Sequence, residues 1–207
     1  SDIDYCVSGA YNLKNFPTGC VTLKHFDKYS YLNLFNGPTF AFKDMALTML
    51  PFFVEVSKRM ENNKNKTVVL TATSGDTGSA ALNGFTKLDN TNIYVLYPTG
   101  KVSQFQEKQM LIFNGSNAKS FAVNGNFDDC QRTVKEFFNN EKYNKIDLSS
   151  ANSINIGRLV PQIIYYFYSY ANLVNEKKIN FNDKVNFCVP TGNFGNILAG
   201  YIAKEMG

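Results

Sequence analysis

Short apolar segments alternate with longer amphipathic segments along most of the chain. Four short segments are rich in Val, Ile, Leu, Phe or Tyr and are bounded by Gly, Asn or Pro, a pattern typical of buried strands. We therefore predict strands at residues 67–73, 92–97, 120–123 and 185–189. The spacing of apolar residues predicts helices at residues 42–59, 78–86, 103–113, 127–140, 159–174 and 195–206. The first stretch of the chain is only weakly patterned.

The order of these elements indicates the fold class. Strands that alternate with helices are joined by right-handed crossovers and form a parallel sheet that is covered on both faces. The sequence therefore predicts an α/β fold with an open, mostly parallel sheet. Ser103 stands three residues before Gln106, as in a helix cap, and Asp128 and Asp129 lie where a helix is expected to begin. In such sheets, ligands bind beyond the carboxyl ends of the strands.

Composition and charge exclude several classes of protein. The chain has 207 residues, of which 44% are hydrophobic and 18% are charged, and its net charge is +4. These values are ordinary for a globular protein of one or two domains and do not indicate a disordered chain or a nucleic-acid-binding surface. Four scattered cysteines and a single histidine favour neither a disulfide framework nor a zinc site. The acidic, polar start is unlike a secretion signal, so we expect a cytoplasmic protein.

The most apolar predicted helix, at 159–174, is too short to cross a membrane. It is also interrupted by four residues that do not suit a membrane span, namely Pro161, Gln162, Ser169 and Asn172. A helix that is apolar nearly all round is instead typical of a protein interior. We therefore expect no membrane partner.

Two glycine-rich loops stand between a predicted strand and a predicted helix. The first covers residues 73–79, with Gly75 and Gly78, and the second covers residues 190–196, with Gly192 and Gly195. Glycine lets the backbone approach a ligand closely, and the N–H groups at a helix start attract anions. Either loop could equally be an ordinary tight turn whose Ser and Thr residues cap the helix. Two such loops in one chain favour a binding role.

Two further segments combine reactive or anion-binding side chains with an unusual setting. Lys43 lies in the apolar run 40–43, and a lysine in apolar surroundings has a lowered pKa and reacts readily with carbonyl groups. The alternative is a lysine whose amine reaches the solvent. Residues 150–158 gather amide, hydroxyl and guanidinium donors, and Arg158 suits a bidentate grip on phosphate or carboxylate. The alternative is a polar helix cap with Arg158 in a structural ion pair.

Taken in order, these segments resemble the threonine synthase family, in its longer bacterial and fungal form. Residues 35–44 (FNGPTFAFKD) resemble the family's HGPTxAFKD motif around its cofactor-carrying lysine. Four more blocks match in sequence and spacing, namely LTATSGDTG at 70–78, LYPTGKVSQFQEK at 96–108, SANSINIGR at 150–158 and VPTGNFGN at 189–196. The resemblance runs from roughly Leu32 to Gly207 and is very specific.

The resemblance implies a pyridoxal-phosphate (PLP) enzyme of fold type II, similar to the tryptophan synthase β subunit. Such enzymes have two α/β domains with the cofactor between them. We expect residues 1–41 and 151–207 to belong to the larger domain and residues 42–150 to form the smaller one. The implied reaction, the last step of threonine biosynthesis, is a lyase reaction that converts the small molecule O-phospho-L-homoserine and water into L-threonine and phosphate.

The resemblance also implies a role for each matching residue. Lys43 is expected to carry the cofactor and to move protons on and off the substrate. The cofactor phosphate is expected to be held by Gly192, Asn193, Phe194, Gly195 and Asn196. The substrate α-carboxylate is expected at Ser74, Gly75, Asp76 and Thr77. The substrate phosphate is expected at Asn152, Ser153 and Arg158, with Lys101 as a weaker candidate. No metal is implied.

Two departures from the family pattern affect these expectations. Position 196 is Asn where many members have Asp, which should be tolerated if backbone groups dominate phosphate binding. Family members also extend well beyond the equivalents of Ser1 and Gly207. We therefore expect a fragment that binds PLP weakly or not at all and has low activity or none.

Two other functions remain open. The first is another fold-type II PLP lyase, of the threonine dehydratase or cysteine synthase type. Those enzymes usually have an Asn in the loop that here contains Asp76, and they need no group like Arg158. The second is a non-catalytic, threonine-synthase-like protein that binds a phosphorylated ligand. Lys43 argues against it, because a simple binder needs no reactive amine.

Overall fold

The computed structural model describes all residues from 1 to 207, and its central feature is a four-stranded parallel sheet. Its strands lie in the order β5-β4-β3-β6, and every neighbouring pair is parallel. The strands are β3 (Thr67–Ala72), β4 (Thr91–Pro98), β5 (Ala118–Val123) and β6 (Asp147–Ser150). This arrangement confirms the predicted α/β class and places the first three predicted strands correctly.

Helices cover both faces of this sheet, as predicted. Helices α4 (Asp76–Phe85) and α5 (Gln104–Leu111) pack on one face, where the largest core cluster contains Val69, Ile93 and Leu82. Helix α6 (Phe127–Asn139) packs on the other face through a smaller cluster. Successive residues of a strand point to opposite faces. Each face of β3 and β4 therefore contributes its own set of apolar side chains, and the sheet is buried on both sides.

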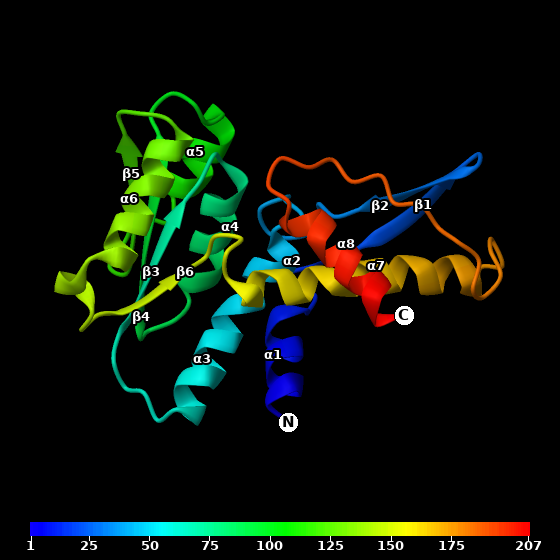
Figure 1. Cartoon of the computed structure of the whole chain (residues 1–207), viewed down its shortest axis with the longest axis horizontal. Helices are drawn as coiled ribbons and strands as arrows, with labels where there is room; N and C mark the ends of the chain where they lie inside the picture. Colours follow the sequence, from blue (N-terminus) through cyan, green and yellow to red (C-terminus); the bar gives the residue numbers. More distant parts are fainter.

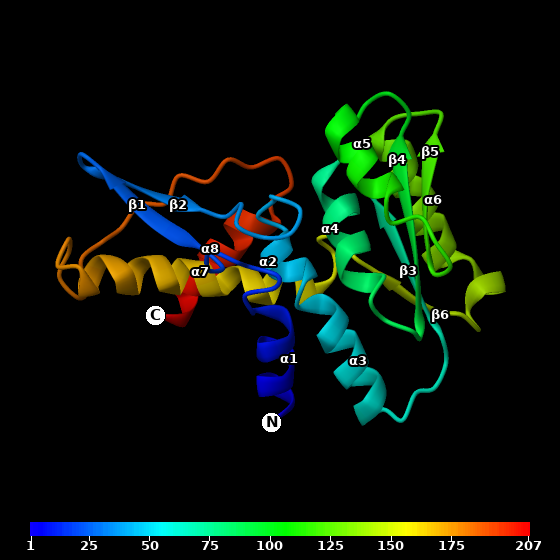
Figure 2. The same ribbon diagram turned by 180° about the vertical axis from the view of Figure 1, so that it is seen from behind.

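A second part of the molecule lies beside the sheet (Figures 1 and 2). It contains helix α7 (Ile156–Asn175), helix α8 (Gly195–Met206) and an antiparallel hairpin of β1 (Thr22–Phe26) and β2 (Tyr29–Asn33). Its core cluster joins α7 and α8 to the N-terminal segment through residues such as Phe16, Tyr165 and Ala199. Met45 of α2 (Asp44–Leu47) also belongs to this cluster, so α2 links the two parts.

Two predicted elements differ from the structure. The predicted helix 42–59 is divided into α2 and α3 (Leu50–Met60). Pro51 lies in the first turn of α3, and because proline has no N–H group it cannot continue the hydrogen-bond ladder of α2. The predicted strand 185–189 is wrong, because residues 184–193 make no backbone–backbone hydrogen bond. Neither sheet has a strand next to this segment, and an apolar run forms a strand only with a partner.

The prediction missed four elements. Helix α1 (Asp2–Ala10) begins with a reciprocal cap between Ser1 and Asp4 and packs against α3. The two strands of the hairpin are joined by a turn in which Asp27 adopts a φ of 52°. Strand β6 is short and polar in sequence, and it is assigned by its pairing with β3 rather than by any apolar pattern.

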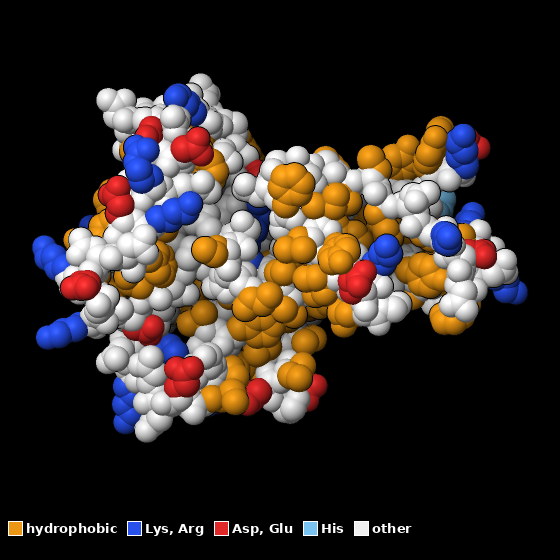
Figure 3. All heavy atoms as spheres, viewed as in Figure 1, with side chains coloured by type: hydrophobic (Ala, Val, Ile, Leu, Met, Phe, Trp, Pro, Cys, Tyr) orange, Lys and Arg blue, Asp and Glu red, His pale blue; other side chains and the backbone are white.

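Helices α7 and α8 also expose apolar side chains together. Figure 3 shows hydrophobic atoms gathered over these helices. The large exposed apolar side chains of these helices are Ile156, Val160, Ile164, Phe167, Tyr168, Ile197, Leu198, Tyr201 and Met206. No helix of the structure combines the length and the apolar character needed to span a membrane.

Candidate active site

A pocket lies where the carboxyl ends of β3 and β6 meet the first turns of α2, α4, α7 and α8. Parallel sheets gather ligand sites at this edge, because the loops that leave the strands converge there. Most of its lining is polar, and it consists of Phe42, Lys43, Ala72, Thr73, Ser74, Thr77, Phe127, Gln131, Asn152, Ser153, Arg158, Gln162, Asn193, Gly195 and Asn196. Four of the five sequence blocks described above supply all of these residues except Phe127, Gln131 and Gln162. The fifth block, 96–108, does not line the pocket.

Lys43 lies at the start of α2 and its side chain is mostly buried, with 18% of its surface exposed. The Nζ atom lies 3.4 Å from Oδ2 of Asp76 and 5.1 Å from the centre of the Phe42 ring. Burial lowers the pKa of the Lys43 amine, and the nearby Arg158 charge lowers it further, whereas Asp76 acts in the opposite direction. Desolvation is the largest effect, so the neutral form of the amine is more accessible than in an ordinary lysine.

The loop before Lys43 is held in a strained conformation by Asp44. Phe40 adopts a φ of 60°, a left-handed conformation that a bulky side chain rarely enters. The buried Asp44 carboxylate accepts hydrogen bonds from the Thr39 hydroxyl at 2.6 Å and from the backbone N–H groups of Thr39 and Ala41 at 2.8 and 3.4 Å. Because these donors lie on either side of Phe40, Asp44 fixes the backbone that positions Lys43.

The loop between β3 and α4 leaves two backbone donors free. The Thr73 hydroxyl oxygen accepts from the N–H groups of Gly75 and Gly78, each at 2.9 Å. Gly75 has a φ of 145°, which only glycine adopts without strain. The N–H groups of Asp76 and Thr77 donate no hydrogen bond within the chain. Two free donors at the positive end of a helix are suited to an anion.

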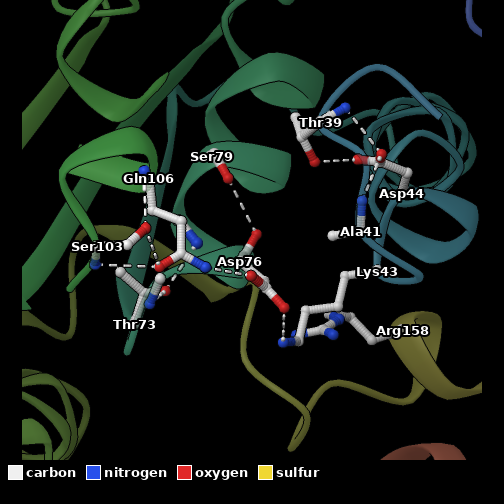
Figure 4. A network of polar contacts seen from close by, with 12 residues as sticks. Thr39, Ala41, Lys43, Asp44, Thr73, Asp76, Ser79, Ser103, Gln106 and Arg158 are labelled. Carbon is white, nitrogen blue, oxygen red and sulfur yellow. Dashed lines mark hydrogen bonds and ion pairs between the residues drawn. The ribbon is translucent and has the colours of Figure 1, made fainter. Parts of the chain in front are cut away.

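The Asp76 side chain is held between Lys43 and helix α5. Gln106 Nε2 donates to Oδ1 of Asp76, while the Oε1 atom of the same amide accepts from the backbone N–H and the hydroxyl of Ser103. Ser103 caps α5 by accepting from the Gln106 N–H at 3.2 Å, which confirms the predicted cap. Figure 4 shows the resulting chain of contacts from Ser103 to Lys43.

Arg158 is a buried cation without an acidic partner. Only 4% of its surface is exposed, it forms no ion pair, and its Nε atom has no hydrogen-bond partner. The guanidinium makes a single hydrogen bond, from Nη1 to the carbonyl of Ala151 at 2.8 Å. Burial lowers the pKa of the guanidinium to about 10. A buried charge is normally paired, so an unpaired guanidinium that lines a pocket indicates an anionic ligand. The structural ion pair considered above is therefore not present.

The neighbouring Asn152 and Ser153 also line this wall, but Asn152 is already engaged. Its Nδ2 atom donates to the carbonyl of Ala72 at 2.7 Å, and its Oδ1 atom accepts from the Ala72 N–H at 3.0 Å. One amide hydrogen of Asn152 is left for a ligand. The segment 150–155 is thus fastened to the end of β3, and α7 starts from this fixed point.

The second glycine-rich loop leads directly into α8 and has many free backbone donors. The N–H groups of residues 192–197 donate no hydrogen bond within the chain. Asn193, Gly195 and Asn196 line the pocket, while Gly192 and Phe194 do not. Free N–H groups around a glycine at the positive end of a helix match the geometry of phosphate sites.

The side chain of Asn196 connects α8 to α7. Its Oδ1 atom accepts from the hydroxyls of Tyr165 at 2.5 Å and Tyr166 at 2.9 Å. Burial raises the pKa of Tyr165 and raises that of Tyr166 to about 12, so both hydroxyls are protonated donors. Asn196 therefore serves to fix the start of α8, whatever its backbone binds.

The structure brings most of the predicted site residues together. Besides the pocket-lining residues, Asp76 reaches the site through its contact with Lys43. Lys101 is exposed and does not line the pocket. The sequence analysis missed Gln162, which is buried and donates to the Arg158 carbonyl at 2.6 Å, and it treated Gln106 only as a cap. No local motif reveals the role of Gln106, because the Asp76 side chain that it contacts lies 30 positions away in the sequence.

Comparisons with known proteins find relatives of this chain among the threonine synthases. No protein-family profile matches the sequence. The threonine synthase of Saccharomyces cerevisiae is 44% identical over 183 residues, which are 85% of this chain and 35% of that protein. The threonine synthase of Haemophilus influenzae is 44% identical over 197 residues, which are 94% of this chain and 44% of that protein.

Solved structures lead to the same family. The crystal structure of PLP-bound threonine synthase from Brucella melitensis superposes with a TM-score of 0.85 and 40% identity, covering 100% of this chain and 43% of that one. The chain is homologous to the threonine synthases. The yeast threonine synthase structure matches with a TM-score of 0.83 and 38% identity, covering 99% of this chain and 42% of that one. The chain thus spans less than half the length of these threonine synthases.

Proposed function

We propose that this chain carries the lysine and the anion-binding loops of a threonine synthase, which uses PLP to convert O-phospho-L-homoserine and water into L-threonine and phosphate. The observation that carries the proposal is a single pocket lined by a mostly buried lysine and a buried, unpaired arginine. The homology to threonine synthases supports this combination. We also propose the domain division at residues 42 and 150; the two main core clusters support it except at Met45 and Ala151, which each belong to the cluster of the other part.

The residues of the pocket fit the cofactor and the substrate. PLP and O-phospho-L-homoserine together present two phosphates, a carboxylate and an aldehyde. The free N–H groups of residues 192–196 would hold the cofactor phosphate, and those of Asp76 and Thr77 would receive the substrate carboxylate. Arg158 and Ser153 would hold the substrate phosphate, and Lys43 would bind the aldehyde. Each group thus has a separate set of donors.

Lys43 would also move protons during the reaction. When bound, PLP supplies an electron-withdrawing ring, which makes the protons on the neighbouring substrate carbons acidic. A base near those carbons must be neutral to accept a proton. Because burial lowers its pKa, the Lys43 amine has a larger neutral fraction near neutral pH than an exposed lysine.

Arg158 would assist the departure of the substrate phosphate. Negative charge accumulates on the leaving group, and a guanidinium fixed in a water-poor site stabilises that charge without reorganising. Its Nε atom has no partner in the chain, so a phosphate oxygen can supply one.

Titration of the chain with PLP, followed by borohydride reduction and peptide mapping, tests the proposal. We expect a visible absorbance band and a covalent label on Lys43. Lys43→Ala should remove both. Lys87→Ala is a matched control, because burial also lowers the pKa of Lys87, which lies at a different pocket. A label on Lys87, a label spread over exposed lysines, or no label would contradict the proposal.

The reaction itself is tested by comparing two products. Release of phosphate from O-phospho-L-homoserine supports a threonine synthase, whereas release of a keto acid from threonine supports a dehydratase. We expect the first activity to be the larger one and to disappear in Lys43→Ala. Keto-acid release without phosphate release would refute the proposed substrate.

A further inference from the structure

The contact between Asp76 and Lys43 depends on a side chain from another helix. Asp76 is 41% exposed, so on its own its carboxylate could turn toward the solvent. Gln106 of α5 donates to the Oδ1 atom, and Oδ2 then lies 3.4 Å from the Lys43 amine. One oxygen of the Asp76 carboxylate is therefore held by Gln106, and the other faces the Lys43 amine (Figure 4).

The position of Gln106 is fixed from two further directions. Its Oε1 atom accepts from the N–H and the hydroxyl of Ser103, which ties it to the capped start of α5. Its amide group also lies against the bare Cα of Gly75, where any Cβ atom would overlap with it. The φ of 145° and this close approach give Gly75 two independent reasons to be glycine. The amide is thus pre-positioned to orient Asp76.

The charge of the Lys43 amine is set by few groups. Asp76 stabilises its protonated form, and Arg158 disfavours it. Asp44, next in sequence, has its carboxylate bound to Thr39 and Ala41 instead. Asp76 is therefore the one acid paired with this amine. Any change in the orientation of its carboxylate alters the balance between the protonated and the neutral amine.

We propose that Gln106 is a positioning residue that orients the Asp76 carboxylate toward Lys43 and thereby controls the protonation of the Lys43 amine. This role rests on the proposed function of Lys43 and extends it to a residue outside the pocket. Without the Gln106 donor, the Asp76 carboxylate turns into the solvent for part of the time. The amine then loses its counter-charge and becomes neutral at a lower pH.

Competitive labelling of amines with a lysine-acylating reagent across a pH series tests the proposal on the chain without cofactor. The rate at which Lys43 is labelled, measured by peptide mass spectrometry, follows the neutral fraction of its amine. Gln106→Met keeps the length of the side chain but removes the amide donor. We expect it to speed Lys43 labelling roughly three- to tenfold at pH values below the pKa, because loss of a counter-charge moves a pKa by about half a unit to one unit.

Three comparisons separate this role from a structural one. Asp76→Asn should produce the same acceleration, and the double variant should add nothing further, because both changes remove one interaction. Tyr97→Phe removes the hydrogen bond from Tyr97 to Glu107 of α5 but keeps the contacts of Ser103, Gln106 and Asp76, so it should lower thermal stability and leave Lys43 labelling unchanged. Labelling of Lys87 serves as the internal reference for an intact fold.

Slower labelling of Lys43 in Gln106→Met would overturn the proposal, since Gln106 would then be holding Asp76 away from the amine. An unchanged rate in Gln106→Met or in Asp76→Asn would also overturn it. If Gln106→Met does not fold, Gln106→Asn carries the same expectation, because its amide is one methylene too short to reach Asp76. The labelling needs no PLP, so its outcome is independent of the PLP titration that tests the proposed function.

Discussion

Replacement of Arg158 by methionine should make the unliganded protein more stable while weakening the binding of phosphate beside Arg158. Methionine is flexible and carries no charge, and it can occupy the buried space that the aliphatic part of the arginine side chain fills. In the native chain the guanidinium is buried, forms no ion pair, and leaves Nε without a partner. A group that binds a ligand can be retained in such a setting even though it lowers stability.

The expected gain can be worked out from the structure. Burial lowers the pKa of Arg158 to about 10. At ~1.4 kcal/mol per pKa unit, keeping the charge buried costs on the order of 3 kcal/mol. Because the folded pKa is below the unfolded one, this cost is fully present at neutral pH and is relieved only as the pH rises through about 10. Loss of the hydrogen bond to the Ala151 carbonyl removes about 1.5–2 kcal/mol. The net gain is about 1 kcal/mol.

Urea unfolding and thermal melts in chloride buffer measure this gain. At ~2–4 °C per kcal/mol for a chain of this size, the melting temperature should rise by a few degrees. Added inorganic phosphate should stabilise the native chain more than Arg158→Met, which keeps only the backbone donors of residues 192–196. Arg132→Met is the matched control, because Arg132 is 65% exposed and its loss should change stability by less than ~0.5 kcal/mol. A destabilisation of 1 kcal/mol or more in Arg158→Met would refute the reasoning, because the guanidinium would then be a structural group.

Two further substitutions test the loops of the site. Gly75→Ala should cost about 1–3 kcal/mol in urea unfolding, since it strains the backbone and displaces the Gln106 amide. Gly115→Ala, where φ is not positive and a Cβ comes no closer than 3.8 Å to another atom, should cost less, and equal costs would contradict this account of Gly75. Asn196→Asp should retain stability and PLP affinity, because a carboxylate accepts from both tyrosine hydroxyls as well as an amide oxygen does, whereas Asn196→Ala should lower stability by about 1–3 kcal/mol. A large loss of affinity in Asn196→Asp would show that the side chain, and not the backbone, binds the phosphate.

The sequence predicted those elements whose pattern is local. Strands β3 and β4 carry apolar runs because both faces of the sheet are buried there, and α5 carries its own cap in Ser103 and Gln106. Residues 185–189 have the same kind of run but no strand beside them. Pairing depends on distant parts of the chain, and an apolar run alone does not reveal it.

The same distinction applies to the site. Lys43 and the two glycine-rich loops could be found from the sequence, because an apolar run around a lysine and paired glycines are visible within ten residues. The sequence could not show that Arg158 is unpaired, because this depends on which acidic side chains lie near it in the folded chain. The contact of Gln106 with Asp76 joins residues 30 positions apart, so no pattern within a short segment of the sequence reveals it.

The pairing of Asn152 with both backbone groups of Ala72 has a mechanical consequence. A side-chain amide here takes the place of one more residue in the strand ladder, beyond the point at which β6 ends. The segment that carries Ser153 is thereby attached to the end of β3, which also lines the pocket. The segment ahead of α8 has no such anchor, because residues 184–193 make no backbone–backbone hydrogen bond, so we expect the width of the cavity to vary mainly on that side.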